Sequence, residues 1–108
     1  MLFLSYLTSI QEPTRNEQVS VGVSSVIVAE SRNTINERKG IIIRNISPDV
    51  ADIITLNIGF NEATLNNGII LKKDESFVDS SETGYKCHQG VITAICATAN
   101  GNLSVYER

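Results

Sequence analysis

Residues 54–60 have the sequence Ile-Thr-Leu-Asn-Ile-Gly-Phe, in which large apolar side chains alternate with small or polar ones. This two-residue period places Ile54, Leu56, Ile58 and Phe60 on one face of an extended chain. One covered face and one open face are typical of an antiparallel strand. The segment therefore predicts a half-buried strand whose four apolar side chains point into the core.

The composition of the 108 residues also favours strands over helices. Ile, Val and Thr account for 31 residues, whereas Leu and Ala, which favour helices, account for only 13. β-branched side chains lose rotamer freedom in a helix and pack well on a pleated surface. A chain of this length forms one small domain, and a hydrophobic content of 42% is enough to give that domain a core.

Two further strands are predicted before residue 54. Residues 19–28 alternate with a slip of one residue at Ser24-Ser25, which we interpret as a β-bulge within one strand. A polar loop is expected over residues 29–38. Residues 40–46 are almost continuously apolar, which predicts a central strand covered on both faces.

Turn residues divide the rest of the chain into short strands. Asn66-Asn67-Gly68 indicates a turn, because Asn and Gly tolerate a positive φ. Two hairpins are expected after it, one joining residues 69–71 to 76–78 and one joining residues 91–97 to 103–106. The second has Asn100-Gly101 in its turn. These signals predict an all-β fold, an antiparallel β-sandwich of the jelly-roll kind with seven to eight short strands.

Residues 1–18 are assigned to an apolar N-terminal arm and residues 19–108 to the β-sandwich domain. The arm lacks the basic region and cleavage pattern of a secretion signal and is too short to cross a bilayer, so we expect no membrane contact. Its apolar side chains favour a protein interface, with an extra edge strand folded back on its own domain as the alternative. These side chains are Leu2, Phe3, Leu4, Tyr6, Leu7 and Ile10.

No catalytic, cofactor-binding or metal-binding residues are predicted. A net charge of -3 argues against a nucleic-acid-binding surface. Cys87, His88 and Cys96 supply only three of the four ligands that structural zinc needs, so we interpret both cysteines as unbridged small hydrophobes. His88 is the single imidazole that a serine triad could use, and no Gly-x-Ser-x-Gly elbow accompanies it.

Two kinds of short motif are given no functional role. The basic pairs Arg38-Lys39 and Lys72-Lys73 are interpreted as solvated flanks or turns. Asn45-Ile46-Ser47 and Asn102-Leu103-Ser104 match the glycosylation sequon, but a chain with 10 Asn and 11 Ser produces such matches by chance.

A longer ordered pattern extends over residues 19–108. Its first long strand, at residues 38–47, is Arg-Lys-Gly-Ile-Ile-Ile-Arg-Asn-Ile-Ser, and residues 67–71 and 75–77 supply Asn-Gly-Ile-Ile-Leu and Glu-Ser-Phe. Residues 90–95 and 101–107 close the pattern. This order of strands and turns resembles small β-sandwich virion proteins of tailed bacteriophages. The resemblance implies a capsid decoration or cement protein, a head-fibre component or a tail accessory, without catalytic residues or cofactors.

The expected function is therefore that of a non-enzymatic virion protein, assembled in the host cytoplasm. Its partners would be other virion proteins, such as the major capsid protein or neck and tail proteins. The resemblance also implies a homo-oligomer, with a trimer favoured. Two alternatives stay open: a receptor- or carbohydrate-binding module of a tail or adhesion apparatus, and a small β-barrel hydrolase that depends on His88.

Overall fold

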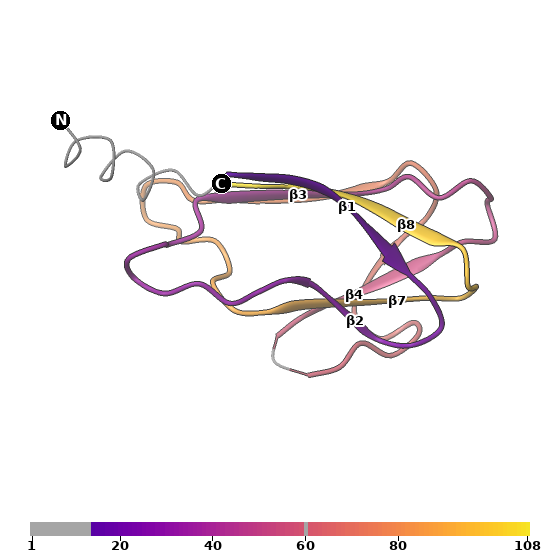
Figure 1. Ribbon diagram of the computed structural model, residues 1–108. Helices are drawn as coiled ribbons and strands as arrows, with labels where there is room; N and C mark the ends of the chain where they lie inside the picture. Colours follow the sequence, from indigo (N-terminus) through magenta and orange to yellow (C-terminus); the bar gives the residue numbers. More distant parts are fainter. Residues whose placement is uncertain (1–13, 60) are drawn as a thin grey trace, which may run out of the picture.

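The computed structural model describes residues 14–59 and 61–108, which form eight strands in two antiparallel sheets (Figure 1). Sheet A has the order β1-β8-β3-β6 and sheet B the order β2-β7-β4-β5. The predicted antiparallel β-sandwich is confirmed. The predicted interface residues Leu2 to Ile10, and Phe60, lie outside the described residues. The strands are β1 (Arg15–Val21), β2 (Val26–Ala29), β3 (Gly40–Asn45), β4 (Ile54–Ile58), β5 (Ile69–Leu71), β6 (Ser76–Ser80), β7 (Ile92–Cys96) and β8 (Gly101–Glu107).

The chain passes from one sheet to the other at every connection except the one between β4 and β5. The two layers therefore assemble together, because each sheet takes its strands from the whole length of the sequence. Two four-stranded sheets with this strand order form a jelly roll. Figure 1 shows the two layers lying face to face.

The core lies between the sheets and is lined by alternate residues of the strands. Ile54 and Leu56 are fully buried, and Ile58 packs against the core, as the alternation in β4 predicts. Sheet A supplies the opposite wall through Ile41 and Ile43 of β3 and through β8. Apolar side chains from both sheets thus meet along the centre of the sandwich.

The predicted bulge at Ser24-Ser25 is wrong, because residues 19–28 are not one strand. β1 ends at Val21 in sheet A, and β2 begins at Val26 in sheet B. Residues 22–25 cross between the layers. The apolar period slips there because Val21 and Val28 approach the same core from opposite sides, and both are buried.

Neither predicted hairpin forms, although both turns are present. Residues 72–75 connect β5 in sheet B to β6 in sheet A, and residues 97–100 connect β7 in sheet B to β8 in sheet A. Asp74 has a φ of 69° in the first turn. Gly101 is needed for close packing, since a Cβ there would come within 2.6 Å of the Val21 carbonyl oxygen. Turn residues therefore predict where the chain reverses, but packing of the core determines which sheet the next strand joins.

The prediction that residues 40–46 form a strand covered on both faces is also wrong. β3 is a central strand of sheet A, between β8 and β6, and its inward residues Ile41 and Ile43 are buried. Its outward residue Ile42 is 42% exposed. The outer face of sheet A is therefore open at this strand.

Residues 61–68 give sheet B a different outer surface. Thr55 and Thr93 point outward from β4 and β7 but are buried beneath this connection. The Thr93 hydroxyl donates to the Asn61 carbonyl (3.0 Å), and the Asn66 amide donates to the Thr55 hydroxyl (3.2 Å). Asn66 has a φ of 64°, so the turn predicted at Asn66-Asn67-Gly68 is confirmed.

Replacement of Leu56 by Ala tests the core assignment. Because Leu56 is fully buried, we expect the free energy of unfolding to fall by about 2–5 kcal/mol. Leu65→Ala is the matched control: Leu65 is 47% exposed, and its truncation should change stability by less than about 1 kcal/mol. Urea unfolding followed by circular dichroism measures both values. Equal effects of the two variants would contradict the assignment.

Candidate functional site

A fully buried arginine lies at one end of the sandwich. Arg38 has no exposed surface, so the prediction that Arg38-Lys39 is a solvated basic pair is wrong for Arg38, whereas Lys39 is exposed. A buried charge is costly unless it is paired and hydrogen-bonded. The surroundings of Arg38 meet this requirement.

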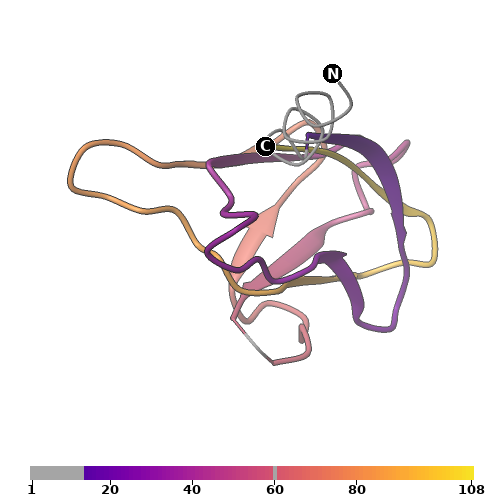
Figure 2. The same ribbon diagram turned by 60° about the vertical axis from the view of Figure 1, so that its left-hand side comes forward.

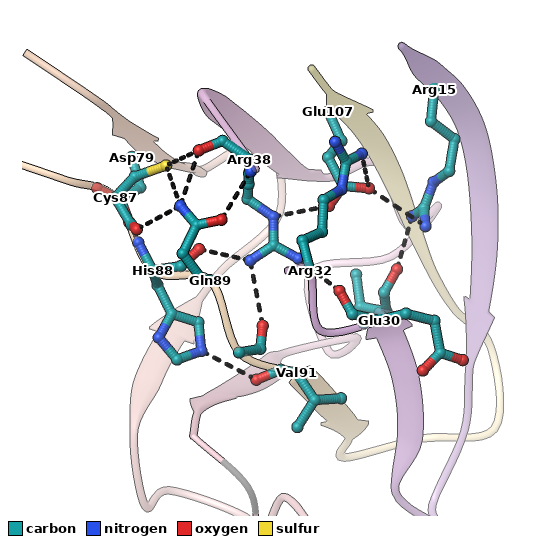
Figure 3. Close-up of polar contacts among 12 residues, drawn as sticks. Arg15, Glu30, Arg32, Arg38, Asp79, Cys87, His88, Gln89, Val91 and Glu107 are labelled. Carbon is teal, nitrogen blue, oxygen red and sulfur yellow. Dashed lines mark hydrogen bonds and ion pairs between the residues drawn. The ribbon is translucent and has the colours of Figure 1, made fainter. Parts of the chain in front are cut away.

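The Arg38 guanidinium donates to four acceptors (Figure 3). Its Nε bonds Glu107 Oε2 at 2.7 Å, and its Nη2 bonds the Glu30 carbonyl at 2.7 Å. Its Nη1 bonds the carbonyls of His88 and Gly90 at 2.5 and 3.1 Å. A planar guanidinium presents its donors in a fixed fork. Arg38 thereby joins the end of β8, the β2–β3 loop and the β6–β7 loop, which are distant in sequence.

The Gln89 side chain holds the backbone of Arg38 in place. Its Oε1 accepts from the Arg38 amide at 2.6 Å, and its Nε2 donates to the Arg38 and Cys87 carbonyls, both at 2.8 Å. The Cys87 thiol also donates to the Arg38 carbonyl (3.1 Å). Cys87 and Cys96 are both free and buried. The thiol of Cys87 is therefore part of the polar network around Arg38.

Glu107 is shared by three arginines. Besides Arg38, Arg32 Nη2 lies 3.1 Å and Arg15 Nη1 lies 3.5 Å from Glu107 Oε1. Arg15 Nη2 also donates to the Val28 carbonyl at 2.6 Å, which links β1 of sheet A to β2 of sheet B. Glu107 is itself buried. One carboxylate thus anchors three guanidiniums at this end of the molecule.

A hollow of about 290 Å³ opens beside this cluster. The Asn33 side chain shapes its rim, because Asn33 Oδ1 accepts from the backbone amides of Ile35 and Asn36 at 2.9 and 3.0 Å. Guanidiniums do not give up a proton at neutral pH, so the two arginines of the lining keep their positive charge. The lining residues are Arg15, Glu30, Ser31, Arg32, Asn33, Asn36 and Glu107.

The residues considered for zinc or for a serine triad are held in structural contacts. His88 Nε2 lies 3.2 Å from the Val91 carbonyl oxygen, and the His88 amide donates to Asp79 Oδ2 at 2.9 Å. Cys96 is buried in β7, whereas the Cys87 thiol bonds the Arg38 carbonyl. Within residues 14–59 and 61–108, no group of three or more His, Cys, Asp or Glu side chains is placed to hold a metal ion.

The β6–β7 loop projects from the sandwich (Figure 2) and exposes Tyr85. Gly84 precedes it with a φ of 83°, and the backbones of Glu82 and Tyr85 pair at 2.9 Å in both directions. The Tyr85 hydroxyl donates to Asp79 Oδ1 at 2.7 Å. This hydrogen bond raises the pKa of Tyr85, because the carboxylate stabilises the protonated phenol. The loop therefore presents an oriented aromatic side chain to solvent.

The Asn45-Ile46-Ser47 sequon lies at the end of β3 that is distant from Arg38, and its asparagine is inaccessible. Asn45 is fully buried, and its amide donates to the carbonyls of Asp52 and Leu71, both at 2.9 Å. Its Oδ1 accepts from the Ser47 amide at 3.0 Å. Asn45 is therefore a structural residue that joins β3 to the β3–β4 connection and to β5.

Apolar side chains on the outer faces of the sheets were not among the predicted site residues. Ile42 and Val78 are exposed on sheet A, and Ile27 and Ile70 are exposed on sheet B. The run Ile41-Ile42-Ile43 did indicate that its middle residue would be exposed, because only alternate residues of a strand face the core in a two-layer sandwich.

No family model, curated protein or solved structure matches this chain. The part of the chain that the structure describes has no helix long and apolar enough to span a membrane.

Replacement of Glu107 by Gln tests the arginine cluster. It removes the carboxylate charge but leaves the buried Arg38 guanidinium, so we expect a loss of about 3–5 kcal/mol in the free energy of unfolding. Glu17→Gln is the control, because Glu17 is exposed and pairs with Arg15 at 3.8 Å. It should cost less than about 1 kcal/mol. A neutral Glu107→Gln variant in chemical unfolding would refute the structural role of the cluster.

Proposed function

We propose that the chain is a structural protein of a bacteriophage particle, either a capsid decoration or cement protein or a head-fibre component. In this role it binds neighbouring virion proteins and catalyses no reaction. The observation that carries the proposal is the open outer face of sheet A, where Ile42 and Val78 offer apolar surface to a partner. The resemblance of residues 19–108 to phage β-sandwich proteins supplies the particle context.

The chemistry of the described residues supports a binding role. The main buried charge cluster is built from three arginines around one carboxylate, and these ion pairs hold loops in place. His88, the single histidine, contacts a backbone carbonyl. Exposed apolar side chains rimmed by polar ones are typical of protein interaction sites.

Self-association is the second part of the proposal. Closed symmetry is the common arrangement for small identical subunits, and the phage resemblance favours three copies. The apolar residues of the N-terminal arm supply contact area for such an assembly, with the arm as an interface segment.

Localisation in purified particles tests the proposed function directly. We expect mass spectrometry of purified virions to detect the chain at a fixed copy number. Imaging should place its density at a symmetric position on the capsid, neck or tail. Particles that contain no copy of the chain would refute the proposal.

Removal of residues 1–12 tests the arm. We expect the full chain to have the solution mass of a trimer and the truncated chain to be a monomer, because burial of one large apolar side chain is worth roughly 1.5–3 kcal/mol and the arm carries six. Light scattering coupled to size exclusion measures both masses, and circular dichroism checks that the sandwich persists. A truncated chain that still forms the trimer would rule out the arm as the interface.

A second candidate is a receptor- or carbohydrate-binding module, which the exposed Tyr85 on the projecting loop favours. Aromatic faces stack on sugar rings, and Asp79 fixes the orientation of this one through its hydroxyl. Glycan-array binding that Tyr85→Ala abolishes would support this candidate. No binding by the wild-type chain would remove this candidate, and binding that persists in Tyr85→Ala would exclude Tyr85 as the contact residue.

A further inference from the structure

An apolar row crosses three strands of sheet A on its outer face. The strand register aligns Asn16 of β1, Tyr106 of β8, Ile42 of β3 and Val78 of β6. Ile42 is 42% and Val78 is 62% exposed, and Tyr106 is half-buried. We call Tyr106, Ile42 and Val78 the outer row. It is a continuous apolar strip that the described residues leave open to solvent.

The face around the outer row carries little charge. The neighbouring row consists of Gln18, Ser104, Arg44 and Ser76. Arg44 is the one charged residue that points outward from the four strands of this sheet, and it pairs with Asp74 at 3.8 Å. Arg108 follows β8 and borders the other side of the outer row, where its Nε would lie 3.5 Å from a Cβ at Gly40. Soluble proteins rarely leave a contiguous apolar patch exposed unless it serves as an interaction site. The outer row is therefore suited to an apolar partner, with charged side chains only at its borders.

The chain itself contains an apolar segment without charged side chains. Residues 2–10 have no charged side chain and include six large apolar ones. β1 begins at Arg15, and the next residue, Asn16, is already aligned with the outer row. β1 thus enters sheet A within one residue of the outer row.

We propose that residues 2–10 of one copy dock on the outer row of a second copy. The inference rests on the proposed self-association and names the surface that receives the arm. An extended segment of nine residues spans about 30 Å, whereas three adjacent strands span about 10 Å, so the segment is long enough to cover the row.

The direction of β1 favours a second copy as the recipient. β1 starts at the end of the sheet where Arg15 is aligned with Glu107, and the outer row lies one residue further along the strand. Docking of residues 2–10 on the row of their own copy would require the chain to reverse direction before Arg15. Docking on a neighbour requires no reversal, and repetition of the contact around an axis closes a symmetric oligomer.

Charge substitution on the two outer faces tests the docking surface. Val78→Asp places a charge in the outer row on edge strand β6, and Ile70→Asp places one on edge strand β5 of sheet B. We expect Val78→Asp to weaken self-association by at least about tenfold and Ile70→Asp by less than about twofold. Sedimentation equilibrium measures association, and thermal unfolding checks that both variants fold.

Disulfide trapping identifies which chain provides the arm. Leu4→Cys and Val78→Cys chains are prepared separately, mixed in equal amounts and oxidised; Cys87 and Cys96 are buried and serve as the unmodified background. We expect a bridge between a Leu4→Cys chain and a Val78→Cys chain. A double variant, Leu4→Cys with Val78→Cys, that forms only a bridge within one chain would overturn docking on a second copy.

The proposed self-association and the proposed docking on the outer row are refuted by different results. A wild-type chain that is monomeric at all concentrations refutes self-association and the docking together. A wild-type oligomer that is unaffected by Val78→Asp and yields no bridge between the mixed chains refutes the outer row alone. In that case the phage assembly role still stands.

Discussion

The buried ion pair between Arg38 and Glu107 is the interaction on which the organisation of this end of the sandwich depends. Removing two charges from water costs several kcal/mol per ion, and good geometry with further hydrogen bonds offsets that cost. Here the further acceptors are the carbonyls of Glu30, His88 and Gly90. The pair therefore fixes the β2–β3 and β6–β7 loops against β8. Apolar contacts alone would place these loops less precisely.

The jelly-roll connectivity explains why polar networks occupy the ends of the molecule. Because the chain changes sheets at nearly every connection, its crossings gather at the two ends and leave backbone groups that need partners. Arg38 and Gln89 supply partners at one end. At the other end Asn45 binds two carbonyls, and the Thr98 hydroxyl donates to Asp52 at 2.5 Å. The apolar core lies between these two networks.

The two outer faces are not equivalent, and this difference indicates which face the proposed partner contacts. Residues 61–68 shelter the outward threonines of sheet B and leave Ile27 and Ile70 exposed on its outer strands. On sheet A the exposed Ile42 and Val78 are aligned on adjacent strands. The projecting β6–β7 loop is attached to the arginine cluster through Gln89 and Cys87. The proposed binding role therefore rests on the open apolar face, and the projecting loop is held to the sandwich by hydrogen bonds.

The amino-acid sequence by itself determined the fold class, because a strand needs only a local two-residue period and a turn needs only local φ preferences. The alternation of Ile54, Leu56 and Ile58 and the turn at Asn66 could be predicted for that reason. The sequence did not reveal that residues 22–25 and 72–75 cross between sheets, since local geometry does not specify which sheet receives the next strand. It also gave no local sign that Arg38 is buried, because the partner Glu107 lies 69 residues away. Only the tertiary structure decided these points, since they depend on contacts between segments distant in the chain.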